Sequence, residues 1–170
     1  MVEAVKLIIL SFFASLGFGI VFRIEKKNLL WAGLGGALTR CAYLLLLSAS
    51  AERLVIALIS SMVAALYAEI MASRQKIPST VFLYPSIIPL IPGDLLYHTV
   101  VHFILGETEE MLTNASNCGL TLLGMSVGFV LISTFTYYKR IYYVAKRFMK
   151  HILTHAGGQD FHEREDRKNT

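Results

Sequence analysis

The segment from Val81 to Leu105, VFLYPSIIPLIPGDLLYHTVVHFIL, is apolar and long enough to enter a bilayer, yet it contains Pro85, Pro89, Pro92 and Gly93. Each proline lacks a backbone N–H and clashes with the carbonyl four residues earlier, so a regular helix cannot continue through the cluster. Carbonyl groups are left without partners, and hydrocarbon cannot satisfy them. Such a break is tolerated where protein buries it or where it lines a wet cavity, and in transporters it indicates the substrate site.

Apolar residues dominate the chain. They make up 55% of its 170 residues, and the mean hydropathy of +0.56 excludes an ordinary soluble domain. Apolar runs between short charge clusters give candidate spans at 4–22, 29–48, 54–72, 80–105 and 118–138. The sequence predicts an all-α integral membrane bundle of about five transmembrane helices, the fourth broken by prolines. No cofactor is indicated.

The loops between the spans alternate in charge. Loops 23–28 and 73–78 are net positive, loop 106–117 is net negative, and a group of Lys and Arg follows residue 138. Because Lys and Arg gather on the cytoplasmic side, we expect the amino terminus outside and the carboxyl terminus in the cytoplasm. The net charge of +4 therefore reports membrane orientation and not a nucleic-acid partner.

The carboxyl-terminal part differs from the rest. We expect a transmembrane transporter domain at 1–138, a basic amphipathic interfacial helix at 139–156 and a disordered polar tail at 157–170. Apolar residues at helical spacing between 141 and 152 alternate with bases. This pattern is typical of a helix that lies on the anionic inner leaflet.

Small residues recur at helical spacing on several spans, which allows close helix packing. The sets are Ser11, Ser15 and Gly19, then Gly33 and Ala37, then Gly124 and Gly128. They predict packing within one chain or a contact between subunits, and a homo-oligomer is therefore one expected assembly.

Arg40 lies about midway along the second span, where a charged side chain costs roughly 3 kcal/mol on insertion scales. It needs a partner or water, and Glu69 and Asp94 are the candidate counter-ions. Either Arg40 faces a polar pathway and attracts a group such as a carboxylate, or it pairs with an acid only to fix helix register.

Asp94, His98 and His102 recur every four residues, so a helix resuming after the break places them on one face. Histidine changes charge near neutral pH, so this stripe could relay protons and couple export to proton antiport. Glu69 is a further proton-coupling candidate. The alternative is a stripe in the headgroup region that bonds water. A metal site is not expected, because no further His or Cys is near in sequence.

The break is the predicted substrate site. Free carbonyls there would coordinate a substrate ammonium or a proton carrier, and half-helix amino ends would attract its carboxylate. Tyr84 and Tyr97 flank the break and either bond the substrate or anchor the chain at the interface. The predicted substrate-binding residues are Tyr84, Pro85, Pro89, Pro92, Gly93, Tyr97 and Arg40.

Three stretches resemble the threonine/serine exporter family, ThrE type. FLYPSIIPLIPGDLLY, residues 82–97, is similar to a family segment with P-x-x-P-G and a following aromatic, matched by Pro89, Pro92, Gly93 and Tyr97. GFGIVFRIEKKNLLWAGLGGAL, residues 17–38, resembles the family's first hairpin. AEIMASRQKIPSTVF, residues 68–82, is similar to its link between the third and fourth spans.

The resemblance implies a small subunit in a bacterial inner membrane, related to the carboxyl-terminal half of single-chain exporters. It implies a larger membrane subunit of the same family as partner, and threonine, serine or a dicarboxylate such as succinate as substrate. Arg40 and the basic tail depart from the family pattern and inherit no role from it.

Other classes stay open. A non-transporting assembly or regulatory subunit would keep the broken segment dry and buried, and a homo-oligomeric channel would need no larger relative. An enzyme is not expected, because no nucleophile has a base and an orienting group at recognisable spacing.

Overall fold

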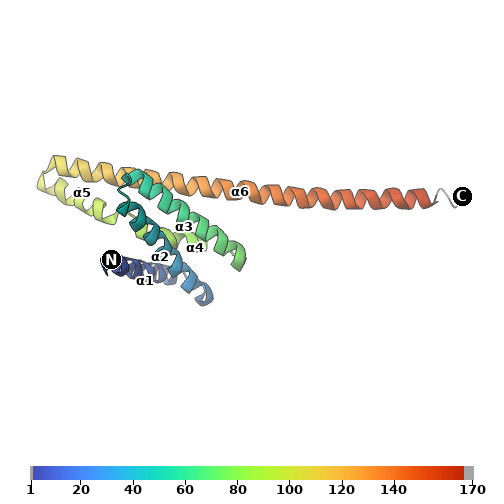
Figure 1. Ribbon diagram of the computed structural model, residues 1–170, viewed down its shortest axis with the longest axis horizontal. Helices are drawn as coiled ribbons and strands as arrows, with labels where there is room; N and C mark the ends of the chain where they lie inside the picture. The colour runs from blue at the N-terminus through green and yellow to red at the C-terminus, as the bar shows by residue number, and fades with distance from the viewer. Residues whose placement is uncertain (1, 167–170) are drawn as a thin grey trace. The chain divides into compact units, whose positions relative to one another are not determined.

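The computed structural model describes the backbone of residues 2–166 and the side chains of residues 2–139. Every regular element in this part of the chain is helical, which confirms the all-α prediction. The elements in Figure 1 are α1 (Val2–Val21), α2 (Lys26–Ser48), α3 (Arg53–Gln75), α4 (Thr80–Ile87), the 3-10 helix η1 (Ile88–Leu90), α5 (Gly93–Leu105) and α6 (Thr108–Asp166).

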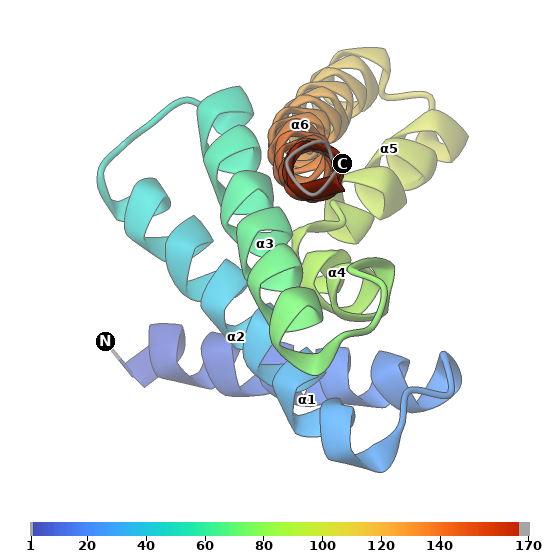
Figure 2. The ribbon, with the colours of Figure 1, turned by 90° about the vertical axis from the view of Figure 1, so that its right-hand side faces the viewer.

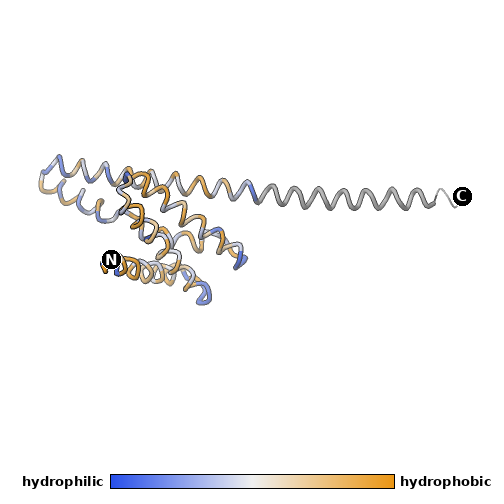
Figure 3. The backbone as a smooth tube through the Cα atoms, viewed as in Figure 1, coloured by the Kyte–Doolittle hydropathy of each residue, from blue (hydrophilic) through white to orange (hydrophobic). Residues whose placement is uncertain are grey.

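Helices α1, α2, α3 and the 108–139 part of α6 are each long and apolar enough to cross a membrane. The segments Thr80–Leu90 and Gly93–Leu105 pass the same test as a pair, bent by 48° at the break between them. Hydrophobic residues run along these helices and hydrophilic residues gather at the connections (Figure 3). The described residues therefore provide four spans, or five if the bent pair is one span, as the sequence predicts.

The chain divides into two compact units, Met1–Ser133 and Thr134–Thr170, and α6 contributes to both. In the second unit α6 stays helical through Asp166, past the boundary expected at 156. The side chains from residue 140 onward lie outside the described part. The interfacial helix at 139–156 and the polar tail at 157–170 therefore stay predictions.

Helix α2 is the centre of the first unit, because α1, α3 and α4 all pack against it (Figure 2). The core is built mostly from alanines and a few larger residues: Ala32, Ala65, Ala68, Met71, Ala72, Phe82 and Leu83. Alanine brings helix backbones close together, and this is how membrane helices associate without a hydrophobic drive between them.

The small-residue stripes pack inside the chain. Ser11, Ser15 and Gly19 are buried on α1, and a Cβ added at Gly36 of α2 would collide with Ser15 Oγ. On α6, a Cβ at Gly124 would lie 2.5 Å from the Leu54 carbonyl oxygen of α3. Of the two interpretations open for these stripes, helix packing within one chain is the one observed.

Candidate functional site

The break between α4 and α5 is narrower than the proline cluster. Pro85 lies inside α4 and removes only one backbone hydrogen bond of that helix, the one to the carbonyl four residues earlier. The regular α-helix ends at Ile87, and the main chain becomes extended at Ile91, with φ −58° and ψ 121°. Ile91 precedes Pro92, and a residue before proline favours such extended conformations. The predicted break at Pro85–Gly93 is thus confined to the stretch from Ile88 to Pro92.

Pro92 turns the chain into α5. Its φ of −79° and ψ of 56° are those of an inverse γ-turn, and the Gly93 N–H accordingly donates to the Ile91 carbonyl at 2.8 Å. Helix α5 begins directly afterwards, with the Leu96 N–H donating to the Pro92 carbonyl at 3.1 Å.

This turn leaves the Pro89 carbonyl without a helical partner. The residue three positions later is Pro92, which has no N–H, and the N–H four positions later is that of Gly93, which is already bonded to Ile91. Arg40 of α2 supplies the missing donor, with Nη1 at 3.4 Å from the Pro89 oxygen. A cation from mid-span therefore meets a carbonyl released by the proline cluster.

Arg40 is half-buried, and its guanidinium carbon lies 5.2 Å from the centre of the Tyr43 ring, close enough for a cation–π contact. Its Nε is buried and has no hydrogen-bond partner among the described residues. Neither of the expected counter-ions, Glu69 and Asp94, forms an ion pair with Arg40 in this part of the chain. Within residues 2–139, the hydrogen-bond partner of Arg40 is a main-chain carbonyl and not an acid.

The approach of α4 to α2 is what brings Arg40 to the break. A Cβ at Gly35 would collide with Ser86 Oγ and lie 2.8 Å from the Tyr67 ring. One turn further along α2, Thr39 is fully buried and donates its hydroxyl to the Gly35 carbonyl at 2.8 Å. The sequence pattern predicts neither Gly35 nor Ser86 at this contact, although the GLGG stretch is a sign of a close backbone approach.

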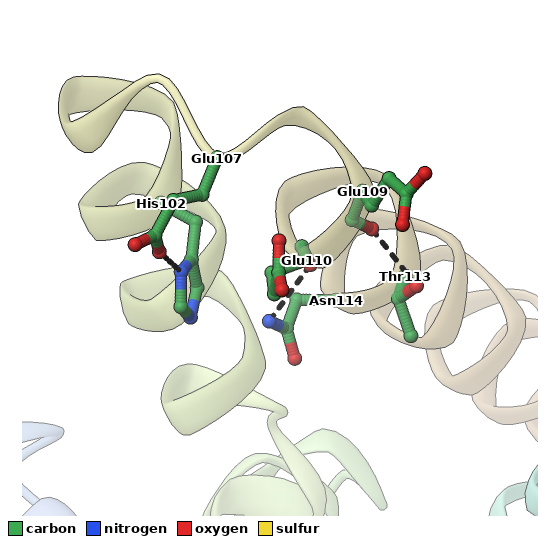
Figure 4. A network of polar contacts seen from close by, with 6 residues as sticks. All are labelled: His102, Glu107, Glu109, Glu110, Thr113 and Asn114. Atoms are coloured by element: carbon green, nitrogen blue, oxygen red, sulfur yellow. Dashed lines mark hydrogen bonds and ion pairs between the residues drawn. The ribbon is translucent and has the colours of Figure 1, made fainter.

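Asp94, His98 and His102 do share one face of α5. His98 Nε2 lies 3.4 Å from Asp94 Oδ1, and the rings of His98 and His102 are 6.1 Å apart. His102 Nδ1 also contacts Glu107 Oε2 across the corner that leads into α6 (Figure 4). Gly106 makes this corner, because its φ of 76° allows the Glu107 N–H to reach back to the His102 carbonyl at 3.0 Å. The stripe thus has a polar contact at each end, Asp94 with His98 and His102 with Glu107, and no hydrogen bond joins the two histidines in this part of the chain.

The other predicted site residues are dispersed. Tyr84 lies on α4 with its ring 6.0 Å from that of Phe22, whereas Tyr97 lies on α5 against His98. Glu69 is half-buried on α3. The structure therefore brings Arg40 and Pro89 together but leaves the two tyrosines in different surroundings.

A family model described as "Threonine/Serine exporter, ThrE" matches residues 7–135. The chain belongs to the threonine/serine exporter family. The ThrE match contains most or all of each candidate span, Arg40, the break and the α5 stripe, and it ends before the basic tail. Membership and the apolar helices together make the chain a multi-pass membrane protein of an exporter family. A comparison with curated proteins and another with solved structures found no match.

Proposed function

We propose that this ThrE-family chain is a membrane subunit of a secondary exporter for small amino acids such as threonine and serine, and that substrate binds at the Arg40–Pro89 contact. The observation that carries the proposal is the 3.4 Å approach of Arg40 Nη1 to the Pro89 carbonyl. This contact is a paired donor and acceptor, and the two groups are complementary to the two charged ends of an amino acid.

A bound substrate could replace the Arg40–Pro89 contact. Its length exceeds the usual 2.7–3.2 Å of an N–H···O hydrogen bond, and its acceptor is neutral. A substrate carboxylate is charged and can accept two parallel N–H bonds from the guanidinium, so it would bind Arg40 more strongly than the neutral carbonyl does. The Pro89 carbonyl is then free to accept from the substrate ammonium, so one amino acid replaces both partners.

The same contact favours amino acids over dicarboxylates. A dicarboxylate such as succinate could take Arg40, but it has no donor for the released Pro89 carbonyl. Leaving a buried acceptor unpaired costs about 1–3 kcal/mol, and the part-buried Pro89 carbonyl would lose a fraction of this. Succinate export, the other substrate class that the sequence suggests, is therefore the second candidate.

Breaking the Arg40–Pro89 contact would also free the break to move. The contact joins α2 to the stretch where regular helix is absent, and alternating access in transporters uses such discontinuous helices. In this proposal Tyr84, Pro85, Pro92, Gly93 and Tyr97 border the path. Each substrate bound thus releases one constraint on the position of α5.

For energy coupling we propose proton antiport through Asp94, His98 and His102, with Glu69 as an additional proton site. Support comes from the 3.4 Å approach of His98 to Asp94 and from the contact of His102 with Glu107, at the start of the loop expected outside. The proposed orientation, with the amino terminus outside, is supported by the Lys and Arg of loops 23–28 and 73–78. The bacterial inner membrane is proposed from the family alone.

A larger membrane subunit of the same family is the proposed partner. Helix α5 has no buried residue in the described chain, so a partner, a second copy or lipid must cover its apolar side chains. A non-transporting assembly role is the alternative in which the partner alone carries the substrate.

The deciding experiment is efflux of labelled threonine, serine and succinate from cells that express the chain with or without its larger partner. We expect Arg40→Gln to abolish threonine and serine efflux and Arg40→Lys to retain part of it, with assembly unchanged on size-exclusion chromatography. Normal efflux of all three substrates in an assembled Arg40→Gln complex would overturn the proposed site and favour the assembly role.

A further inference from the structure

A cavity of about 400 Å³ lies at the amino end of α4, at the opposite end of that helix from the break. Its walls come from residues 22–25 between α1 and α2, from the first turn of α2, from residues 77–78 between α3 and α4, and from the first half of α4. This volume is within the range of about 300–1,000 Å³ that is typical of small-molecule sites.

Asn28 is the unexplained polar group of this cavity. Its side chain is 1% exposed, and its Oδ1 has no hydrogen-bond partner among the described residues. Buried polar atoms are nearly always paired in native proteins, because leaving them unpaired costs free energy. A ligand that brings a donor into the cavity would supply the missing partner.

An anion-binding feature adjoins Asn28. Helix α2 begins here with Glu25 at its N-cap, and no side chain caps it. The first N–H groups of a helix have no partner within the helix, so this end attracts negative charge. One cavity is therefore lined by an acceptor that lacks a donor, Asn28 Oδ1, and by the end of a helix whose first N–H groups lack acceptors.

Arg23 adds a cation in a strained position. It ends α1 in a Schellman motif, with the Ile24 N–H donating to the Gly19 carbonyl at 3.0 Å and the Arg23 N–H to the Ile20 carbonyl at 2.9 Å. Arg23 has a φ of 55°, in the left-handed region where glycine is usual. Strain of this kind at a non-glycine residue is often retained where the side chain has a function.

Helix α3 ends in a similar way, which provides an internal control. Lys76 has a φ of 56°, and the Ile77 N–H reaches back to the Ala72 carbonyl at 3.2 Å. Ile24 and Ile77, which follow Arg23 and Lys76, both line the cavity, whereas Ser50, the third non-glycine residue with a positive φ in the described chain, does not. Arg23 lines it as well, whereas Lys76 is not among the lining residues.

We infer that this cavity is a second ligand site, which takes a molecule with a primary ammonium next to an anionic group. The ammonium donates to Asn28 Oδ1 beside the Glu25 carboxylate, and the anion lies between Arg23 and the amino end of α2. The assignment of a cytoplasmic amino acid as ligand, waiting to enter the export path, rests on the proposed function. A phosphoethanolamine headgroup has the same chemistry and is the other source.

The test is binding of labelled threonine to the purified full chain in nanodiscs of phosphatidylcholine. Arg23→Gly removes the cation and suits the left-handed backbone, and Lys76→Gly makes the same backbone change away from the cavity wall. We expect Arg23→Gly to weaken threonine binding by about tenfold or more while Lys76→Gly leaves it unchanged. Asn28→Leu should lose binding similarly, and thermal unfolding of each variant checks that the fold persists.

The outcomes separate the two proposals. Equal threonine affinity in wild type, Arg23→Gly and Asn28→Leu would overturn the inference, even if export is normal. If threonine binding depends on Arg23 but export is unchanged by Arg40→Gln, the proposed transport site is overturned and the cavity site is kept. If threonine does not bind, co-purified phosphatidylethanolamine retained by wild type and lost from Arg23→Gly assigns the site to lipid. If the wild type retains neither threonine nor phosphatidylethanolamine, the inference of a ligand site in this cavity is overturned.

Discussion

The two halves of the broken span differ in what surrounds them. Helix α4 buries Phe82, Leu83, Pro85 and Ser86 against α2 and α3, whereas α5 has no buried residue in the described chain. Both halves are apolar, so hydropathy alone does not distinguish them. The difference shows that one half is held by its own chain and the other depends on lipid or a partner.

The break is therefore a boundary between a fixed helix and an uncovered one. Arg40 contacts the chain at this boundary, through the Pro89 carbonyl. Directly after the boundary, a Cβ added at Gly93 would meet no neighbouring atom within 4 Å. Motion at the break would move α5 and leave α4 in place. The following experiments test this asymmetry.

The largest effect is expected at Gly35, where α4 meets α2. Gly35→Ala would force its methyl group into Ser86 and Tyr67, and such overpacking costs typically about 1–3 kcal/mol. Gly93→Ala is the matched control, because its methyl group would meet open space. Thermal unfolding in detergent should show a lowered midpoint for the first variant only. Equal midpoints would mean that α4 is not fixed by this contact.

Photo-crosslinking compares the two halves directly. With p-azidophenylalanine in place of Phe103, which is 70% exposed on α5, we expect crosslinks to lipid or to another subunit. In place of Phe82, which is fully buried on α4, the same label should crosslink several-fold less to other molecules. Mass spectrometry of the products identifies the neighbour. Similar intermolecular yields at both positions would remove the proposed asymmetry.

Asp94→Asn tests whether the uncovered half carries the protons. The variant keeps a side chain of the same size but removes the carboxylate next to His98. For proton antiport, wild-type efflux should rise when the outside is acidified, and most of this rise should be lost in the variant. Efflux with the normal pH response, in a complex that assembles normally, would exclude Asp94 from coupling.

The smallest effect is expected at the corner between α5 and α6. His102 and Glu107 are partly exposed, so Glu107→Gln should cost less than about 1 kcal/mol of stability. Thermal unfolding midpoints of the variant and the wild type measure this loss. A fall in midpoint as large as that of Gly35→Ala would mean that the corner is a main support of the fold.

Much of the fold follows from the sequence. Apolar length and charge clusters located most of the helices within a few residues, because a bilayer core demands about 20 apolar residues from each span. The prolines predicted that the fourth span is interrupted, and the interruption is observed at Pro89 and Pro92, whereas α4 accommodates Pro85. Helical spacing likewise placed Asp94, His98 and His102 on one face.

Tertiary structure decided which groups meet. The sequence left open whether Arg40 faces a polar pathway or pairs with an acid, and the turn at Pro92 leaves the Pro89 carbonyl unsatisfied and within its reach. The stripes of small residues fitted packing within a chain or between chains, and contacts such as Gly36 with Ser15 show that they pack within the chain. The local sequence pattern determines which backbone groups lack hydrogen-bond partners. Only the packing of helices that are distant in sequence determines which groups pair with them.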